Sequence, residues 1–119
     1  RKFDLDERLI NFAVSVIDIS ESLPKTFAGN HIASQLVRSA TSPALNYGEA
    51  QSAESRNDFI HKMKVSAKEL RETYNCLRII KMKSWYQENI LLSVINENNQ
   101  LISIFVKSIE TAKRNNATK

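Results

Sequence analysis

Residues 55–77 read SRNDFIHKMKVSAKELRETYNCL, and the spacing of the apolar side chains in this stretch decides the fold. Successive apolar positions are three or four residues apart, which places them on one face of an α-helix. They are Ile60, Met63, Ala67, Leu70, Tyr74 and Leu77. Ser55 and Asp58 precede this run with the three-residue spacing of a helix N-cap. The stretch therefore predicts a long amphipathic helix that begins just after Ser55.

The same apolar spacing recurs on both sides of this helix. In the N-terminal segment it covers Leu5, Leu9, Phe12, Val16, Ile19 and Leu23. Asp4 and Glu7 have the spacing of a capping box there, and Pro24 ends the helix because the residue before a proline leaves helical geometry. In the C-terminal segment the pattern covers Leu91, Ile95, Asn98, Ile102, Phe105, Ile109 and Ala112. Residues 83–87 form a connector short enough to make the last two helices antiparallel neighbours.

One more helix, the second in chain order, is expected from about residue 30 to residue 53, and Pro43 lies in its middle. Its predicted inward positions are Ile32, Leu36, Ala40, Ala44 and Tyr47. A proline inside a helix removes one backbone hydrogen bond and crowds the preceding turn. We therefore expect this helix to be kinked or split near Ala40 to Ser42.

Length and composition agree with a bundle of these four helices. The chain has 119 residues, enough for one core, and only 2 Gly and 2 Pro, too few for the many turns of a sandwich or barrel. The predicted fold is an all-α, antiparallel up-down four-helix bundle whose second helix is kinked at Pro43. Residues 1–119 are expected to form this single domain.

Several kinds of site and of location are excluded by what the sequence lacks. Cys76 is the single cysteine, and His31 and His61 have no second ligand at helical spacing, so neither a disulfide framework nor a zinc site is expected. Both glycines are isolated, which excludes a glycine-rich phosphate loop. No apolar run is long enough for a membrane span. We predict a soluble, cytoplasmic protein with no cofactor, no metal and no membrane partner.

Positive charge is concentrated in one helix. Residues 56–83 carry 8 basic side chains against three acidic ones, Asp58, Glu69 and Glu72. Helical spacing places four of the basic residues in one stripe beside the apolar face, and the acids on the other side. The stripe is formed by Lys64, Lys68, Arg71 and Arg78. Such segregation favours nucleic-acid binding through phosphates, whereas the alternative is an ordinary solvated face.

Two helices carry more apolar surface than one bundle core needs. The first has a second stripe at Ile10, Val14 and Ile17, and the last adds Val94, Leu101 and Ile104 beside its main seam. Exposed stripes of this length are typical of interfaces. Asn98 also lies on the seam of the last helix, where a single polar residue commonly fixes register or oligomeric state. We therefore predict that the protein is a homo-oligomer.

The segment from Leu23 to Lys83 resembles a known family. The motif that carries the resemblance is Ser42-Pro43-Ala44-Leu45-Asn46-Tyr47-Gly48-Glu49, joined to Ser55-Arg56-Asn57-Asp58-Phe59. It is similar to the four-helix proteins encoded in intervening sequences of bacterial 23S ribosomal RNA genes, and to the related accessory variability determinant of diversity-generating retroelements. The resemblance implies a four-helix bundle, a homo-oligomeric ring typically of five subunits, a basic surface for nucleic acid, and no catalytic site.

The residues of this motif region have a structural or an interface role in the predicted bundle. They are Arg38, Pro43, Asn46, Glu49, Arg56 and Phe59. Among the charged ones we expect an arginine–carboxylate pair that joins two helices, because charges inside a bundle must be paired. A surface for assembly or ligand contact is the alternative, and spacing does not separate the two.

Two other functions remain open from the sequence. Arg56 and His61 fit the Arg-x4-His spacing that resembles the motif of helical HEPN ribonucleases, where both residues act on the scissile phosphate. The relationship to the accessory determinant also allows a structural adaptor that engages a protein such as a reverse transcriptase. The favoured function is non-catalytic binding of nucleic acid, most of all structured RNA or a ribonucleoprotein, through the basic stripe.

Overall fold

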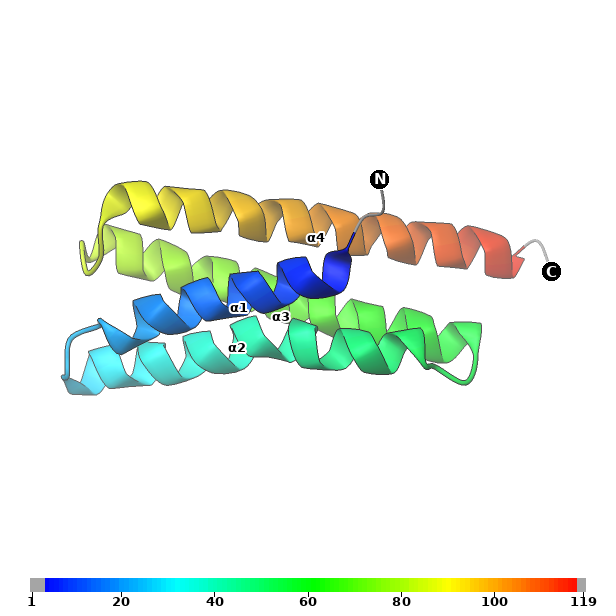
Figure 1. Cartoon of the computed structure of the whole chain (residues 1–119), viewed down its shortest axis with the longest axis horizontal. Coiled ribbons are helices and arrows are strands. Elements are labelled where there is room, and N and C mark those ends of the chain that lie inside the picture. The colour runs from blue at the N-terminus through cyan, green and yellow to red at the C-terminus, as the bar shows by residue number, and fades with distance from the viewer. Residues whose placement is uncertain (1–3, 118–119) are drawn as a thin grey trace.

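The computed structural model describes residues 4–117, and these residues form four helices and no strand (Figure 1). The helices are α1 (Leu5–Glu21), α2 (Phe27–Gln51), α3 (Arg56–Met82) and α4 (Glu88–Ala117). Figure 1 shows the chain reversing its direction at each connection. α2 packs on α1 and α3, and α4 packs on α3, whereas α1 and α4 contact each other more sparsely. The predicted all-α four-helix bundle is confirmed.

Side-chain caps fix where three of the helices begin. The Asp4 carboxylate accepts a hydrogen bond of 3.1 Å from the Glu7 amide, and the Ser55 hydroxyl accepts one of 3.0 Å from the Asp58 amide, as predicted. Thr26 caps α2 by accepting from the Gly29 amide at 3.0 Å. This cap explains why α2 starts at Phe27 rather than near residue 30.

The connection between α1 and α2 requires a glycine in the first turn of α2. A Cβ added to Gly29 would lie 2.0 Å from the Pro24 carbonyl oxygen, which is far inside van der Waals contact. The connection between α3 and α4 is residues 83–87, as predicted, and Ser84 adopts a left-handed backbone there with φ of 56°. Both tight connections keep neighbouring helices in contact along their length.

The core follows the apolar seam of each helix. All six predicted inward positions of the N-terminal segment are buried, five of them in α1 and Leu23 just after it. In α3 five of the six predicted positions are buried. Two buried polar contacts join neighbouring helices. The Ser39 and Thr73 hydroxyls are hydrogen-bonded at 2.8 Å between α2 and α3, and the Asn98 side-chain amide donates to the Leu70 carbonyl at 3.0 Å between α4 and α3.

α2 continues through Pro43 without interruption, so the helix is not split there. Pro43 is buried, and it has no N–H to donate to the Ser39 carbonyl one turn earlier. The Ser39 hydroxyl nevertheless keeps α2 attached to α3 at this level through Thr73. The kink at Pro43 stays a prediction.

Candidate functional site: a basic face and an adjoining groove

The four basic residues of the predicted stripe are exposed on α3. Within the part of the chain that the structure describes, none of Lys64, Lys68 or Arg71 forms an ion pair with a carboxylate. Arg78 lacks such a pair as well, and its guanidinium lies 5.5 Å from the centre of the Tyr74 ring. The stripe therefore presents positive charge to solvent without a direct carboxylate partner among the described residues.

The carboxylates of α3 are engaged elsewhere. Arg38 on α2 donates to Glu69 at 3.0 Å and also to Glu72, and the hydrogen bond to Glu72 is the main cause of the raised pKa of Arg38. Asp58 accepts from Lys62 at 3.1 Å. An arginine–carboxylate pair joins two helices, but it differs from the predicted one. Its acids are Glu69 and Glu72 of α3 rather than Glu49, and the Arg38 side chain is 52% exposed rather than buried.

Glu49 and Asn46 take no part in that pair. Glu49 is exposed, and the Asn46 amide donates to the Ser42 hydroxyl at 2.9 Å within α2. The residues of the family motif are thus distributed over separate contacts. Spacing along the sequence could not show this, because the pairing depends on how α2 and α3 are rotated against each other.

α4 adds a lysine to the basic stripe. Lys64, Arg71 and Lys113 line one pocket of about 220 Å³, with Glu110 at the same place. The side-chain contact with Lys113 lowers the pKa of Lys64, because two ammonium groups so close together disfavour each other's charge. We call Lys64, Lys68, Arg71, Arg78 and Lys113 the basic face. Lys113 was missed from the sequence because only the packing of α4 on α3 brings it here.

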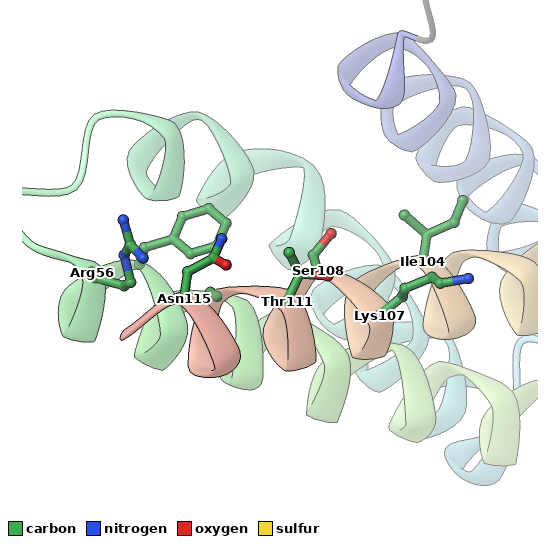
Figure 2. Close-up of a pocket in the computed structure, with 8 residues that line it drawn as sticks. Arg56, Ile104, Lys107, Ser108, Thr111 and Asn115 are labelled. Carbon is green, nitrogen blue, oxygen red and sulfur yellow. The ribbon is translucent and has the colours of Figure 1, made fainter. Parts of the chain in front are cut away.

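A second and larger pocket lies between the first turn of α3 and the last turns of α4 (Figure 2). Its volume is about 520 Å³, and we call it the α3–α4 groove. It is lined by Arg56, Phe59, Ile104, Lys107, Ser108, Thr111, Ala112 and Asn115. Figure 1 shows that α1 begins beside the middle of α4, so α4 extends past the first turn of α1 at this end of the bundle. Arg56 and Phe59 of the family motif therefore share one site.

The Arg56 and His61 side chains occupy different surroundings. Arg56 is half-buried in the α3–α4 groove, whereas His61 is exposed and does not line it. Two side chains that are five residues apart on an α-helix differ in direction by about 140° around the helix axis, so Arg56 and His61 lie on different sides of α3. Their shared helix does not bring them together.

The predicted interface residues divide into three groups. On α1, Ile10 and Val14 are 46% and 52% exposed, and Ile17 is half-buried. Ile104 is half-buried and lines the α3–α4 groove. The remaining two were placed wrongly, since Leu101 is 0% and Val94 8% exposed within a single chain.

The physical reason for this correction is that α4 carries two overlapping apolar seams. The core seam contains Leu91, Val94, Asn98, Leu101, Phe105 and Ile109. The seam predicted from spacing replaced two of these with Ile95 and Ile102, which are only half-buried. Both seams have helical spacing, and only contact with α3 and α1 decides which of them faces inward.

The described residues give little support for a metal site, a reactive thiol or a membrane-spanning helix. No group of three His, Cys, Asp or Glu side chains in residues 4–115 has an arrangement suited to a metal ion. Cys76 is buried, and desolvation raises the pKa of its thiol, which disfavours the reactive thiolate. None of the helices in this part of the chain has both the length and the apolar character needed to cross a bilayer.

Comparisons with known proteins agree with the resemblance drawn from the sequence. A model of the family described as 23S rRNA-intervening sequence protein matches residues 1–107. A crystal structure from Bacteroides thetaiotaomicron, of a protein of unknown function in the S23 ribosomal protein family, is similar with a TM-score of 0.82 and 27% identity. The match covers 89% of this chain and 98% of that one. No curated protein matches the sequence. The chain therefore belongs to the 23S rRNA-intervening sequence protein family.

Proposed function

We propose that this protein is a non-catalytic, homo-oligomeric binder of structured RNA, and that the basic face holds the phosphate backbone. The observation that carries the proposal is the separation of charge on α3. The acids of this helix are neutralised by Arg38 and Lys62, while the four basic residues of the stripe have no carboxylate partner among the described residues. A polyanion is the partner that such a surface attracts.

The geometry of the basic face suits a run of phosphates. Lys64 and Arg78 are fourteen residues apart, which corresponds to about 21 Å along α3. The contact between Lys64 and Lys113 is unfavourable without an anion, and a phosphate oxygen between the two ammonium groups would make it favourable. No groove-reading motif accompanies these residues, so contacts to phosphate rather than to bases are expected.

RNA is favoured over DNA because the family name refers to 23S rRNA. The nuclease alternative is disfavoured because catalysis on one phosphate needs its acid and base positioned together, and Arg56 and His61 are not. Self-association would repeat the basic face on one assembly. Several weak phosphate contacts would then act on one RNA molecule with high effective concentration.

Filter binding of a structured RNA tests the proposal. Changing Lys64, Lys68 and Arg71 together to Glu should remove RNA retention at moderate salt, while circular dichroism and oligomer mass stay unchanged. The matched control changes Lys25, Lys81 and Lys83 to Glu, which alters the net charge equally at exposed positions outside the basic face. Equal loss of RNA retention in both variants would show that net charge alone explains the binding, and it would count against a specific basic face. Unchanged retention in the first variant would refute the proposal.

A further inference from the structure

α1 has an apolar outer surface that its own chain does not cover. Ile10, Val14 and Ile17 are spaced by four and three residues, so they form one continuous ridge, which we call the α1 ridge. Ile10 and Val14 are 46% and 52% exposed. The opposite side of α1 carries the buried seam from Leu5 to Ile19, so the α1 ridge points away from the core.

Acidic residues surround the α1 ridge at both of its ends. Asp6 and Glu7 precede it by one turn, and Asp18 and Glu21 follow Val14. All four side chains are exposed, and none of them forms an ion pair within the described residues. The ridge is therefore an apolar line with negative charge at each end.

The α3–α4 groove has the complementary character. Phe59, Ile104 and Ala112 supply apolar lining, and Arg56 and Lys107 add positive charge. Neither cation is paired with a carboxylate in the part of the chain that is described. Ser108 and Ala112 are small, so they leave room for the side chains of an approaching helix.

The spacing of the charges on the two surfaces also agrees. Arg56 and Asn115 both line the groove (Figure 2), and Lys107 is eight residues before Asn115, about 12 Å along α4. On α1, Glu7 and Asp18 are eleven residues apart, about 16 Å. The flexible stems of arginine and lysine span the difference. α1 cannot fill the groove of its own chain, because its ridge faces away from the bundle.

We propose that the α1 ridge of one copy docks into the α3–α4 groove of a second copy. Asp6 or Glu7 then pairs with Arg56, and Asp18 or Glu21 pairs with Lys107. This inference rests on the self-association in the proposed function and names its two surfaces. The contact is heterologous, so each copy offers one ridge and one groove, and assembly continues until a ring closes. The groove and the pocket of Lys64 and Lys113 lie on different sides of α4, which leaves the basic face uncovered.

Two variants, each blocked on one surface, test this arrangement. Val14→Arg places a cation on the ridge, and Thr111→Trp fills the groove from an exposed position on α4. Light scattering coupled to size exclusion should give a mass near 13.6 kDa for each variant alone. An equimolar mixture should give twice that mass and nothing larger, because the intact groove of one variant accepts the intact ridge of the other. A mixture that stays monomeric, or variants that keep the wild-type mass, would overturn the docking mode.

Matched controls and a charge exchange keep the test independent of folding. Leu45→Arg changes a residue that is 71% exposed on α2 and should leave the oligomer mass unchanged. Lys107→Glu should weaken assembly, and adding Asp18→Lys in the same chain should restore it, because Asp18 lies at the end of the ridge that pairs with Lys107. A wild-type protein that is itself monomeric would refute the self-association, whereas wild-type mass in both blocked variants would refute only the two surfaces. RNA retention by the basic face is measured separately with the triple variant above.

Discussion

The side-chain amide of Asn98 donates a hydrogen bond of 3.0 Å to the carbonyl oxygen of Leu70, and both residues are 0% exposed. This contact joins α4 to α3 in the middle of the core, on the seam where the sequence placed a single polar residue. The Asn98 side-chain oxygen has no partner among the described residues. The polar group is therefore only half satisfied, which limits its contribution to stability.

Replacing Asn98 with Leu should change the free energy of unfolding by less than about 1 kcal/mol. Leucine fills a similar space, and the Leu70 carbonyl keeps its hydrogen bond within α3. Asn98→Asp should instead cost about 3–5 kcal/mol at neutral pH, because it buries a charge without a partner. Burial raises the pKa of that new carboxyl, so the loss should diminish as pH falls and the group becomes neutral. Urea unfolding at several pH values measures both effects, and equal stability of the two variants at neutral pH would contradict them.

The ion pair at the start of α3 predicts a pH dependence with the opposite sign. The hydrogen bond from Lys62 lowers the pKa of Asp58 below its ordinary value of 3.8. The stabilisation is complete above the unfolded pKa and is lost as pH falls through the lower folded pKa. Asp58→Asn should therefore flatten the decrease in melting temperature between about pH 5 and pH 2. The control is Glu54→Gln, which changes an exposed acid outside that salt bridge and should keep the wild-type profile.

Binding to RNA should depend steeply on salt if the basic face holds phosphates. Each neutralised phosphate contributes about −0.7 to the slope of log K against log salt on a single strand, and about −0.9 on duplex DNA. Lys68→Ala and Arg78→Ala should each make the slope less negative by about this amount. Lys25→Ala should leave it unchanged, since Lys25 lies in the connection between α1 and α2. A slope that is insensitive to all three changes would place the RNA elsewhere.

Purified protein should leave RNA intact, and His61→Ala should affect neither RNA integrity nor retention on a filter. His61 is exposed and does not line the groove that contains Arg56, so these two residues are not positioned to act together on one phosphate. Gel analysis of a labelled RNA after prolonged incubation provides the measurement. Cleavage by the wild type that disappears in the His61 variant would establish the nuclease alternative.

Local signals in the sequence were enough to predict the helices. The Ser55 cap, the break at Pro24 and the connector 83–87 are short-range features, since they depend on backbone geometry within a few residues. The inward face of α1 was also predicted correctly, because only one line of apolar residues along this helix is free of charged side chains. The concentration of basic residues on α3 and their separation from its acids followed from helical spacing as well.

Relations between helices required the tertiary structure. The core seam of α4 includes Val94 and Leu101 because of how this helix packs, and either of its two seams satisfies the helical period. Arg38 meets Glu69 and Glu72, and Lys113 meets Lys64, only after α2 and α4 take their places on α3. The α3–α4 groove exists because α1 begins beside the middle of α4 and leaves the last turns of α4 uncovered (Figure 1). Periodicity fixes which residues share a face of one helix, whereas the rotation and overlap of neighbouring helices are set by the packing of all four together.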